Sequence, residues 1–120
     1  MQRHPSLVPL SHEHFDALAA ARRVLTAADD QPPTSLAAHL LQLPLDGHFL
    51  VEEATLVPLL PADLRDRLLA DHRALRADLA HAASPEPHRD RLLAAAQRLH
   101  DHVRWEERVA FAWLETQVLK

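Results

Sequence analysis

The 120-residue chain has no cysteine, no tyrosine and a single glycine. Without cysteine it can form no disulfides and offers no thiolate as a metal ligand or nucleophile. The lack of cysteine also gives no sign of an oxidising compartment. The scarcity of glycine and the abundance of alanine, leucine and arginine favour helices over strands.

An excess of positive charge and long apolar runs are missing as well. The formal net charge is −4 with histidine neutral, so the composition does not indicate a nucleic-acid-binding surface. No apolar run approaches the ~20 residues that span a bilayer. The first residues lack the charged and then apolar pattern of a signal peptide. We therefore expect a cytoplasmic protein with no membrane partner.

The residues that are present are those of an ordinary globular protein with one unusual feature. Hydrophobic residues make up 48% and charged residues 25% of the chain, which is enough for a buried core. The length predicts one domain over residues 1–120. The unusual feature is the presence of ten histidines, whose positions are more informative than their number.

Apolar spacing and helix-breaking residues divide the chain into four helical segments. We expect helices over about residues 11–30, 35–60, 62–83 and 85–118. Ser11 is a candidate N-cap of the first helix, and Ser84 followed by Pro85 is a start signal for the last. Pro44 and Gly47 should kink or divide the second. The short connections predict an all-α fold, an antiparallel up-down-up-down four-helix bundle.

The most informative stretch lies near the C-terminus, where His102 and Glu106 stand four residues apart. Residues at this spacing share a helix face, so the imidazole and the carboxylate aim at one point. Both fall within the apolar stripe formed by Leu92, Ala95, Leu99, Val109 and Trp113. A carboxylate that faces a core is costly unless it is paired, and a metal ion would bind both groups. His48 and Glu52 repeat the arrangement on the second helix.

The first and third helices each place a histidine on the apolar stripe, His14 and His72 respectively. The distance of each residue from the nearest turn can be estimated at ~1.5 Å per residue along its helix. By this estimate His14, His72 and Glu52 lie at similar levels along the bundle axis. His102 lies further from its turn. A start of the last helix after Pro87, or an end of that helix that overhangs the bundle, would remove much of this difference.

Four histidines and two carboxylates exceed the four ligands of a closed zinc site. They suit two transition-metal ions, with His14 and His48 on one ion, His72 and His102 on the other, and Glu52 and Glu106 as bridges. Imidazole and carboxylate without thiolate favour iron or manganese, with zinc as an alternative. Positions would remain open for water or a small exogenous ligand.

Each position also has a structural alternative. A lone buried histidine such as His72 is usually hydrogen-bonded within a core, whereas buried carboxylates such as Glu52 and Glu106 are rare without a partner. We expect Glu53 and Glu107 to be solvated.

His12 lies beside His14 on a polar face and is a weaker candidate ligand. The aromatic side chains are expected to pack in the core, namely Phe15, Phe49, Trp105, Phe111 and Trp113.

Each expected helix contains one short motif, and together the motifs extend over most of the chain. They are residues 10–18 (LSHEHFDAL), 48–58 (HFLVEEATLVP), 71–76 (DHRALR) and 102–111 (HVRWEERVAF). These motifs resemble those of hemerythrin-like proteins, also called the hemerythrin HHE cation-binding domain family. The resemblance implies a non-heme di-iron centre in a four-helix bundle. It also implies dioxygen binding, oxygen or redox sensing, nitric oxide or peroxide handling, or iron sensing.

Two positions differ from the oxygen-carrying members of that family. Those proteins have a second histidine one turn after the third-helix ligand, where this chain has Arg76. Their last motif is His-x-x-x-x-Asp, whereas His102 and Glu106 form the shorter motif of many bacterial relatives. We expect a less fully ligated second ion, and pairing of Arg76 with Glu53 or another nearby carboxylate. The difference bears on reversible oxygen carriage more than on metal binding.

Three classes of function remain open at this stage. The leading hypothesis is a di-iron protein that binds or senses a small molecule such as dioxygen. Its rival is an enzyme that acts on peroxide or nitric oxide at the same centre. The third class is an iron storage or sensing module. A protein-interaction bundle without metal leaves the buried Glu52 and Glu106 unexplained.

Overall fold

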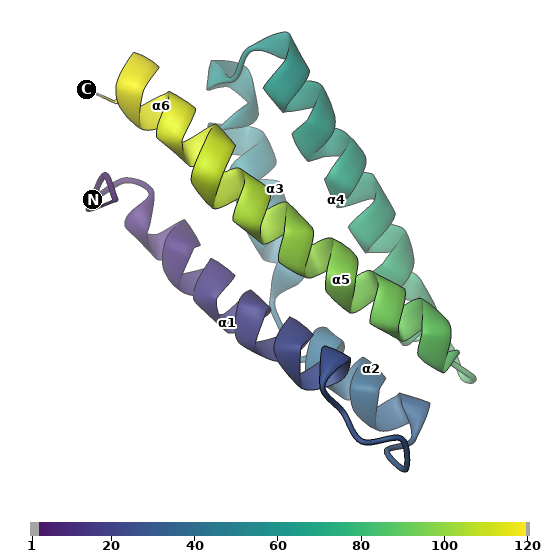
Figure 1. Ribbon diagram of the computed structural model, residues 1–120. Coiled ribbons are helices and arrows are strands. Elements are labelled where there is room, and N and C mark those ends of the chain that lie inside the picture. Colours follow the sequence, from purple (N-terminus) through teal and green to yellow (C-terminus); the bar gives the residue numbers. More distant parts are fainter. Residues whose placement is uncertain (1–2, 120) are drawn as a thin grey trace.

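The computed structural model describes residues 3–119, and its helices form an all-α four-helix bundle (Figure 1). In chain order the elements are α1 (Val8–Leu25), α2 (Pro33–Leu41), α3 (Leu45–Thr55), the 3-10 turn η1 (Val57–Leu59), α4 (Ala62–Ala82), α5 (Arg89–Trp105), the π-helical turn η2 (Glu106–Ala110) and α6 (Phe111–Gln117). Helices α2 and α3 together make the second arm, and α5 to α6 make the fourth. Successive arms alternate in direction, which confirms the predicted topology (Figure 1). Within the described range there is no strand.

No described helix is both long enough and apolar enough to cross a membrane.

The first helix begins earlier and ends earlier than the sequence pattern predicts. It starts at Val8 with Pro9 in the next position, where the fixed φ of proline suits a helix start. The prediction of Ser11 as N-cap is therefore wrong, because Ser11 lies within the helix and its hydroxyl donates to Glu107. The helix ends at Leu25 instead of near residue 30.

The second arm is divided where the prolines and the glycine predict a break. Helix α2 ends at Leu41, and α3 begins after Pro44. Because proline has no N–H to donate to the preceding turn, the helix cannot continue through this point. Gly47 lies inside α3 with a negative φ, so the division follows from Pro44.

The last arm starts at Arg89 with His88 as its extended N-cap, so the predicted start at Pro85 is wrong. The hydroxyl of Ser84 donates to the carbonyl of His81 and closes the end of α4 instead. The late start after Pro87 is the shift that brings His102 closer to the level of the other histidines. That expectation is confirmed.

Two apolar clusters fill the bundle, one on each side of a polar layer. The larger contains Ala17, Val24, Leu75 and Leu99, while the smaller contains Leu7, Leu10, Leu56, Leu60, Leu68, Ala110, Phe111 and Leu114. On α1 the smaller cluster ends at Leu10 and the larger begins at Ala17. The polar layer between them, about two turns deep on α1, is thus bounded on both sides by close-packed apolar side chains.

The π-helical turn η2 changes the face that the end of the fourth arm buries. A π-helical turn holds one residue more than an α-helical turn, so every later side chain is rotated about the axis. Val109 is consequently 41% exposed, which contradicts its predicted place in the buried stripe, whereas Phe111 and Leu114 are fully buried. Turns of this kind occur frequently at functional sites, and this one starts at Glu106.

Candidate metal centre

Six polar side chains from the four arms meet between the two apolar clusters. Each of them is at most 5% exposed. They are His14 on α1, His48 and Glu52 on α3, His72 on α4, His102 on α5 and Glu106 at the start of η2. We refer to this set as the six-residue cluster. The structure thus brings together all six of the residues singled out in the sequence.

Glu52 lies among three of the histidines. Its Oε1 is 3.2 Å from Nε2 of His48 and 3.1 Å from Nε2 of His72, and its Oε2 is 3.5 Å from Nε2 of His14. The i,i+4 spacing places Glu52 and His48 on one face of α3, as the sequence predicts. The other two histidines come from neighbouring arms of the bundle.

Glu106 takes the corresponding position on the fourth arm. Its Oε2 is 2.8 Å from Nε2 of His102, and its Oε1 is 3.4 Å from Nε2 of His14. The first of these contacts is short but is not aligned as a hydrogen bond, and neither atom has another partner among the protein groups. Such an arrangement is expected of two ligands that point at a common third atom.

Five buried atoms of the cluster lack a hydrogen-bond partner, and they provide a test of whether a metal fits. The atoms are Nε2 of His14 and of His102, Oε2 of Glu52, and both carboxylate oxygens of Glu106. An unsatisfied buried polar atom costs ~1–3 kcal/mol, and more when the group is charged. A cation would satisfy all five, because imidazole nitrogens and carboxylate oxygens are both good ligands for transition metals. The residues present therefore fit a metal.

The ligand atoms fall into two overlapping groups, each with all atoms within 4.8 Å of one another. The groups are His14, His48, Glu52 and Glu106, and Glu52, His72, His102 and Glu106. Both carboxylates belong to both groups, whereas each histidine belongs to one. This is the division expected from the sequence for two ions with two bridging carboxylates.

A second set of carboxylates surrounds the histidines, and we call it the outer ring. The contacts are Glu13 Oε1 with His48 Nδ1 (2.9 Å), Glu53 Oε2 with His72 Nδ1 (2.8 Å), Asp71 Oδ2 with His102 Nδ1 (2.9 Å) and Glu107 Oε2 with His14 Nδ1 (2.6 Å). Each carboxylate comes from one arm and reaches the histidine of the next, and the last contact closes the circle. An ionised carboxylate can only accept, so each Nδ1–H donates. In a neutral ring Nε2 then carries the lone pair that faces the interior.

Two members of the outer ring are themselves held in place by polar partners. Arg76 donates to both oxygens of Glu53, at 2.7 and 3.0 Å, so the expected pairing of these residues is confirmed. The hydroxyl of Ser11 donates to Glu107 at 2.9 Å. The prediction that Glu53 and Glu107 are solvated is therefore wrong. Both side chains are mostly covered, and each orients one histidine of the cluster.

Among the protein groups alone, the cluster shifts several pKa values. Burial lowers the pKa of His14, but its hydrogen bond to Glu107 and the nearby Glu52 carboxylate outweigh this and leave the pKa raised. Burial also lowers the pKa of His48, but its contacts with Glu52 and Glu13 outweigh burial and leave the pKa raised. Burial would raise the pKa of the Glu52 carboxyl, but the three surrounding histidines hold it far below its usual range.

His102 behaves differently from these two histidines. Burial is the largest influence on its imidazole, and the hydrogen bond to Asp71 does not offset it, so the pKa of His102 is lowered. Since a ligand imidazole must be neutral, His102 is ready to bind a metal near neutral pH. His14 and His48, whose pKa values are raised, lose a proton only at a higher pH than usual.

Two phenylalanines cover the cluster. Phe49 is stacked on the ring of His72 with centroids 4.1 Å apart, and Phe111 is stacked on His14 with centroids 5.3 Å apart. Both are fully buried, as predicted. Phe15 is 73% exposed, so the prediction that it packs in the core is wrong, because its position on α1 points away from the bundle.

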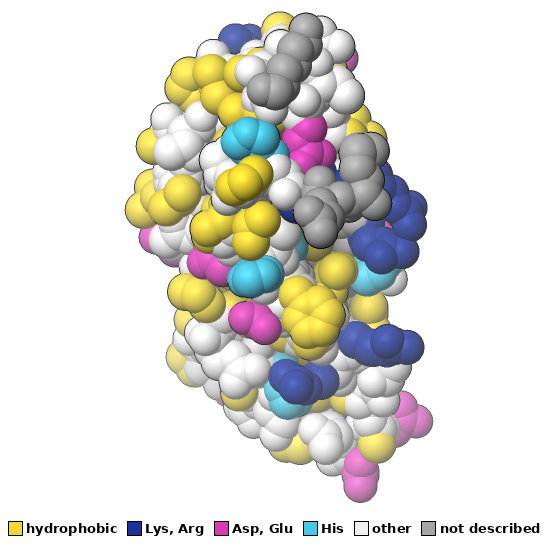
Figure 2. Space-filling view, turned by 90° about the vertical axis from the view of Figure 1, so that its left-hand side faces the viewer, with side chains coloured by type: hydrophobic (Ala, Val, Ile, Leu, Met, Phe, Trp, Pro, Cys, Tyr) yellow, Lys and Arg dark blue, Asp and Glu magenta, His cyan; other side chains and the backbone are white. Residues whose placement is uncertain are grey.

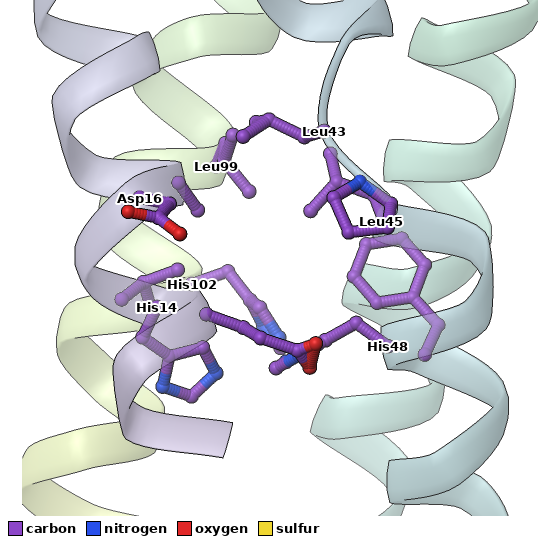
Figure 3. A pocket seen from close by; sticks show the side chains of 12 residues that line it. His14, Asp16, Leu43, Leu45, His48, Leu99 and His102 are labelled. Atoms are coloured by element: carbon purple, nitrogen blue, oxygen red, sulfur yellow. The ribbon is translucent and has the colours of Figure 1, made fainter. Parts of the chain in front are cut away.

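A small cavity of about 30 Å³ adjoins the cluster. In Figure 3, His14, His48 and His102 lie at one end of this cavity, and Leu43 and Leu99 lie at the other. Its lining is largely apolar, with Glu13 and Asp16 as the carboxylates. A cavity of this size has room for a water molecule or another small molecule.

The outer ring is the part of the site that sequence analysis missed. A signal was present, because each member is the direct neighbour of a cluster residue: Glu13 of His14, Glu53 of Glu52, Asp71 of His72 and Glu107 of Glu106. His12, by contrast, is exposed and contacts none of the cluster.

Comparison with protein families matches residues 6–114 to the family described as the hemerythrin HHE cation binding domain. The matched range is nearly the whole chain and includes the six-residue cluster and the outer ring. No curated protein and no solved structure gave a match.

Proposed function

Because the chain belongs to the hemerythrin HHE cation-binding domain family, we propose that it is a non-heme di-iron protein that binds or senses a small molecule such as dioxygen. The observation that carries the proposal is the sharing of Glu52 and Glu106 by both groups of candidate ligands. Two shared carboxylates offset the charge of two cations held close together, which a single metal would not require.

The chemistry of the donors supports iron. Each group offers two imidazole nitrogens and two carboxylate oxygens, with no thiolate. This set suits iron or manganese, with zinc as an alternative. Four protein ligands leave positions free on an ion that prefers six, and two iron ions held there supply one-electron redox steps and sites for an exogenous ligand.

The cavity beside the cluster supports a very small, uncharged ligand. Its volume of about 30 Å³ has room for a diatomic molecule. The apolar side chains that line it, such as Leu99 and Val103, favour a neutral molecule over an anion. Dioxygen and nitric oxide meet both requirements. Phe49 and Phe111 shield the histidines from bulk water on other sides.

One observation favours the enzyme alternative, in which the centre acts on peroxide or nitric oxide. Glu13 lines the cavity and also contacts Nδ1 of His48, and it is the most exposed member of the outer ring. A carboxylate that touches both the cavity and solvent can carry protons between them. Turnover that requires a reductant, and that is lost in Glu13→Gln with the metal content unchanged, would establish this alternative.

The deciding experiment is anaerobic reconstitution with ferrous iron, followed by metal analysis and optical spectroscopy. We expect close to two iron ions per chain and a spectrum that changes on exposure to dioxygen, azide or nitric oxide. Tight iron binding with no spectral response to any of the three would indicate storage or a structural metal instead. Absence of bound iron would contradict the proposal altogether.

A further inference from the structure

A groove rich in arginine runs along the outside of the bundle between α1 and the fourth arm. One part, of about 440 Å³, is lined by Arg22, Leu18 and Arg104, and the adjoining part, of about 460 Å³, by Arg104, Arg108 and Phe15. Leu18 and Arg104 line both parts, so the two are continuous. We refer to the whole as the arginine groove.

Four arginines line this groove, and three of them take no part in the ion pairs of the fold. The fourth, Arg3, pairs with Glu107, which also lines the groove, and with Glu115. In the described part of the chain, Arg22, Arg104 and Arg108 form no ion pair, whereas other arginines, such as Arg76 and Arg98, pair with carboxylates. The groove is therefore positive on a protein whose net charge is −4. Figure 2 shows dark blue side chains gathered along one side of this face, next to exposed hydrophobic surface.

Phe15 gives the groove an apolar anchor. At 73% exposure it is the most exposed large hydrophobic side chain of the described residues. A side chain this exposed contributes little buried apolar area to the bundle. Together with arginine it is typical of protein–protein interfaces, in which aromatic residues and arginine are enriched.

The floor of the groove reaches the six-residue cluster. His14 and Glu107 both line the part that contains Phe15. Glu107 Oε2 is 2.6 Å from Nδ1 of His14, whose Nε2 faces Glu52 and Glu106. A molecule seated in the groove would thus be separated from the candidate metal centre by one histidine side chain.

We propose that the arginine groove docks an acidic electron-carrier protein that reduces the centre. The groove is too shallow and open to enclose a small ligand as most ligand pockets do, whereas its charge suits an acidic surface. The carrier, which holds a flavin or an iron–sulfur cluster, is oxidised by one electron in each transfer. Two transfers convert two ferric ions into two ferrous ions. The proposal rests on the di-iron function proposed above.

The experiment compares two charge-reversed pairs with the wild-type protein. One pair is Arg22→Glu with Arg104→Glu, in the groove. The other is Arg73→Glu with Arg91→Glu, which reverses two exposed arginines that also lack a carboxylate partner and line no part of the groove. The probe is an acidic flavin carrier of the flavodoxin type. Its dissociation constant is measured by titration, and its electron transfer to the iron-loaded protein is measured by stopped-flow absorbance.

We expect the groove pair to slow electron transfer by at least about tenfold and to weaken binding, because electrostatic steering and complementarity are lost. The pair outside the groove should behave like the wild-type protein. Added salt should slow the wild-type reaction and leave the groove pair nearly unaffected. Phe15→Ala should weaken binding without changing the salt dependence.

Equal effects of the two pairs, or binding that is independent of salt, would overturn the proposal. So would tight binding of free flavin mononucleotide in the groove, because the occupant would then be a small anion. Reduction by dithionite distinguishes failure of the docking proposal from failure of the proposed di-iron function. A centre that dithionite reduces in every variant retains its function even if the carrier does not discriminate among them. A protein that holds no reducible iron contradicts the proposed function, while the titrations still test the groove.

Discussion

Glu107 Oε2 lies 2.6 Å from Nδ1 of His14, although 93 positions separate the two residues in the sequence. This contact joins the last arm of the bundle to the first and completes the outer ring. Each histidine of the cluster is therefore oriented by a carboxylate from another helix. The ligand geometry depends on the packing of all four arms, so the metal and the bundle should stabilise each other.

The first prediction concerns this closing contact. Glu107→Ala should weaken metal binding by ~10–100-fold, because His14 loses the partner that fixes its tautomer and ring orientation. Competition with a chelator of known affinity measures the change. Glu86→Ala, at an exposed position between α4 and α5, is the matched control and should bind as the wild-type protein does. Equal affinities for the two variants would mean that the outer ring does not orient the ligands.

The second prediction separates the bridging carboxylates from their neighbours. Glu52→Ala and Glu106→Ala should each lower the number of metals per chain more than Glu53→Ala does, because a bridge contributes to both ions. Elemental analysis after dialysis gives the number directly. The same metal content in all three variants would contradict the assignment of the bridges.

The third prediction distinguishes the two histidines of the first motif. His14→Ala should lose metal, since His14 is buried and its Nε2 faces both carboxylates. His12→Ala should retain it, since His12 is exposed on the opposite side of α1. If His12→Ala lost metal to the same extent, the first-helix ligand would have to be reassigned.

The six-residue cluster could be predicted because its signal is local. A histidine and a glutamate four residues apart on an apolar stripe can be recognised as candidate ligands without knowledge of the fold, as with His48 and Glu52. The direction of the arms could be predicted for a similar reason, since short connections leave little choice.

The outer ring could not be predicted because it depends on contacts between helices. Glu53 is rotated by about 100° from Glu52 on the helix, and this spacing suggests a solvent-facing side chain. Its partner His72 belongs to the next arm, and only the packed bundle brings the two together.

The π-helical turn was missed for another reason. One extra residue in a turn leaves no mark on the composition, so the sequence spacing alone continues the apolar stripe through Val109. Phe15 was misplaced because an aromatic residue is usually buried. Its exposure is informative only once the surface around it is known.

The fourth prediction tests the cavity as the site of the small ligand. Val103 lines the cavity, and Val103→Ile adds one methylene to a space of about 30 Å³. We expect nitric oxide to bind about tenfold more weakly, because one methylene in a closely fitting pocket is worth ~1–3 kcal/mol. The metal content should not change.

Val24→Ile is the control for this substitution, because Val24 is equally buried in the larger apolar cluster but does not line the cavity. Optical titration of the iron-loaded proteins measures the affinity. Unchanged affinity in Val103→Ile, with the substitution shown to fill the cavity, would place the small ligand elsewhere.

The last prediction concerns how the stability of the fold depends on pH. The direction of this dependence follows from the pKa shifts of three groups. The pKa values of His14 and His48 are raised in the folded protein, so both histidines stabilise the metal-free fold fully at a pH below their unfolded pKa of about 6.5. This stabilisation is lost as the pH rises through their folded pKa values. The lowered pKa of Glu52 acts in the opposite sense, giving stability above about 4.5 that is lost in acid.

Bound metal reverses the direction in which the histidines make stability depend on pH. Ligand imidazoles must be neutral, so metal binding competes with protons, which His14 and His48 retain to a higher pH than usual, and it becomes tighter as the pH rises. A metal that binds only the folded state adds about 2.7 kcal/mol at a hundredfold excess over its dissociation constant. The difference in melting temperature between metal-loaded and metal-free protein should therefore narrow from pH 7 to pH 5 and widen above pH 7. Calorimetry at a fixed excess of free metal measures both branches. A difference that stayed constant over this range, with metal shown to remain bound, would mean that these histidines are not the ligands.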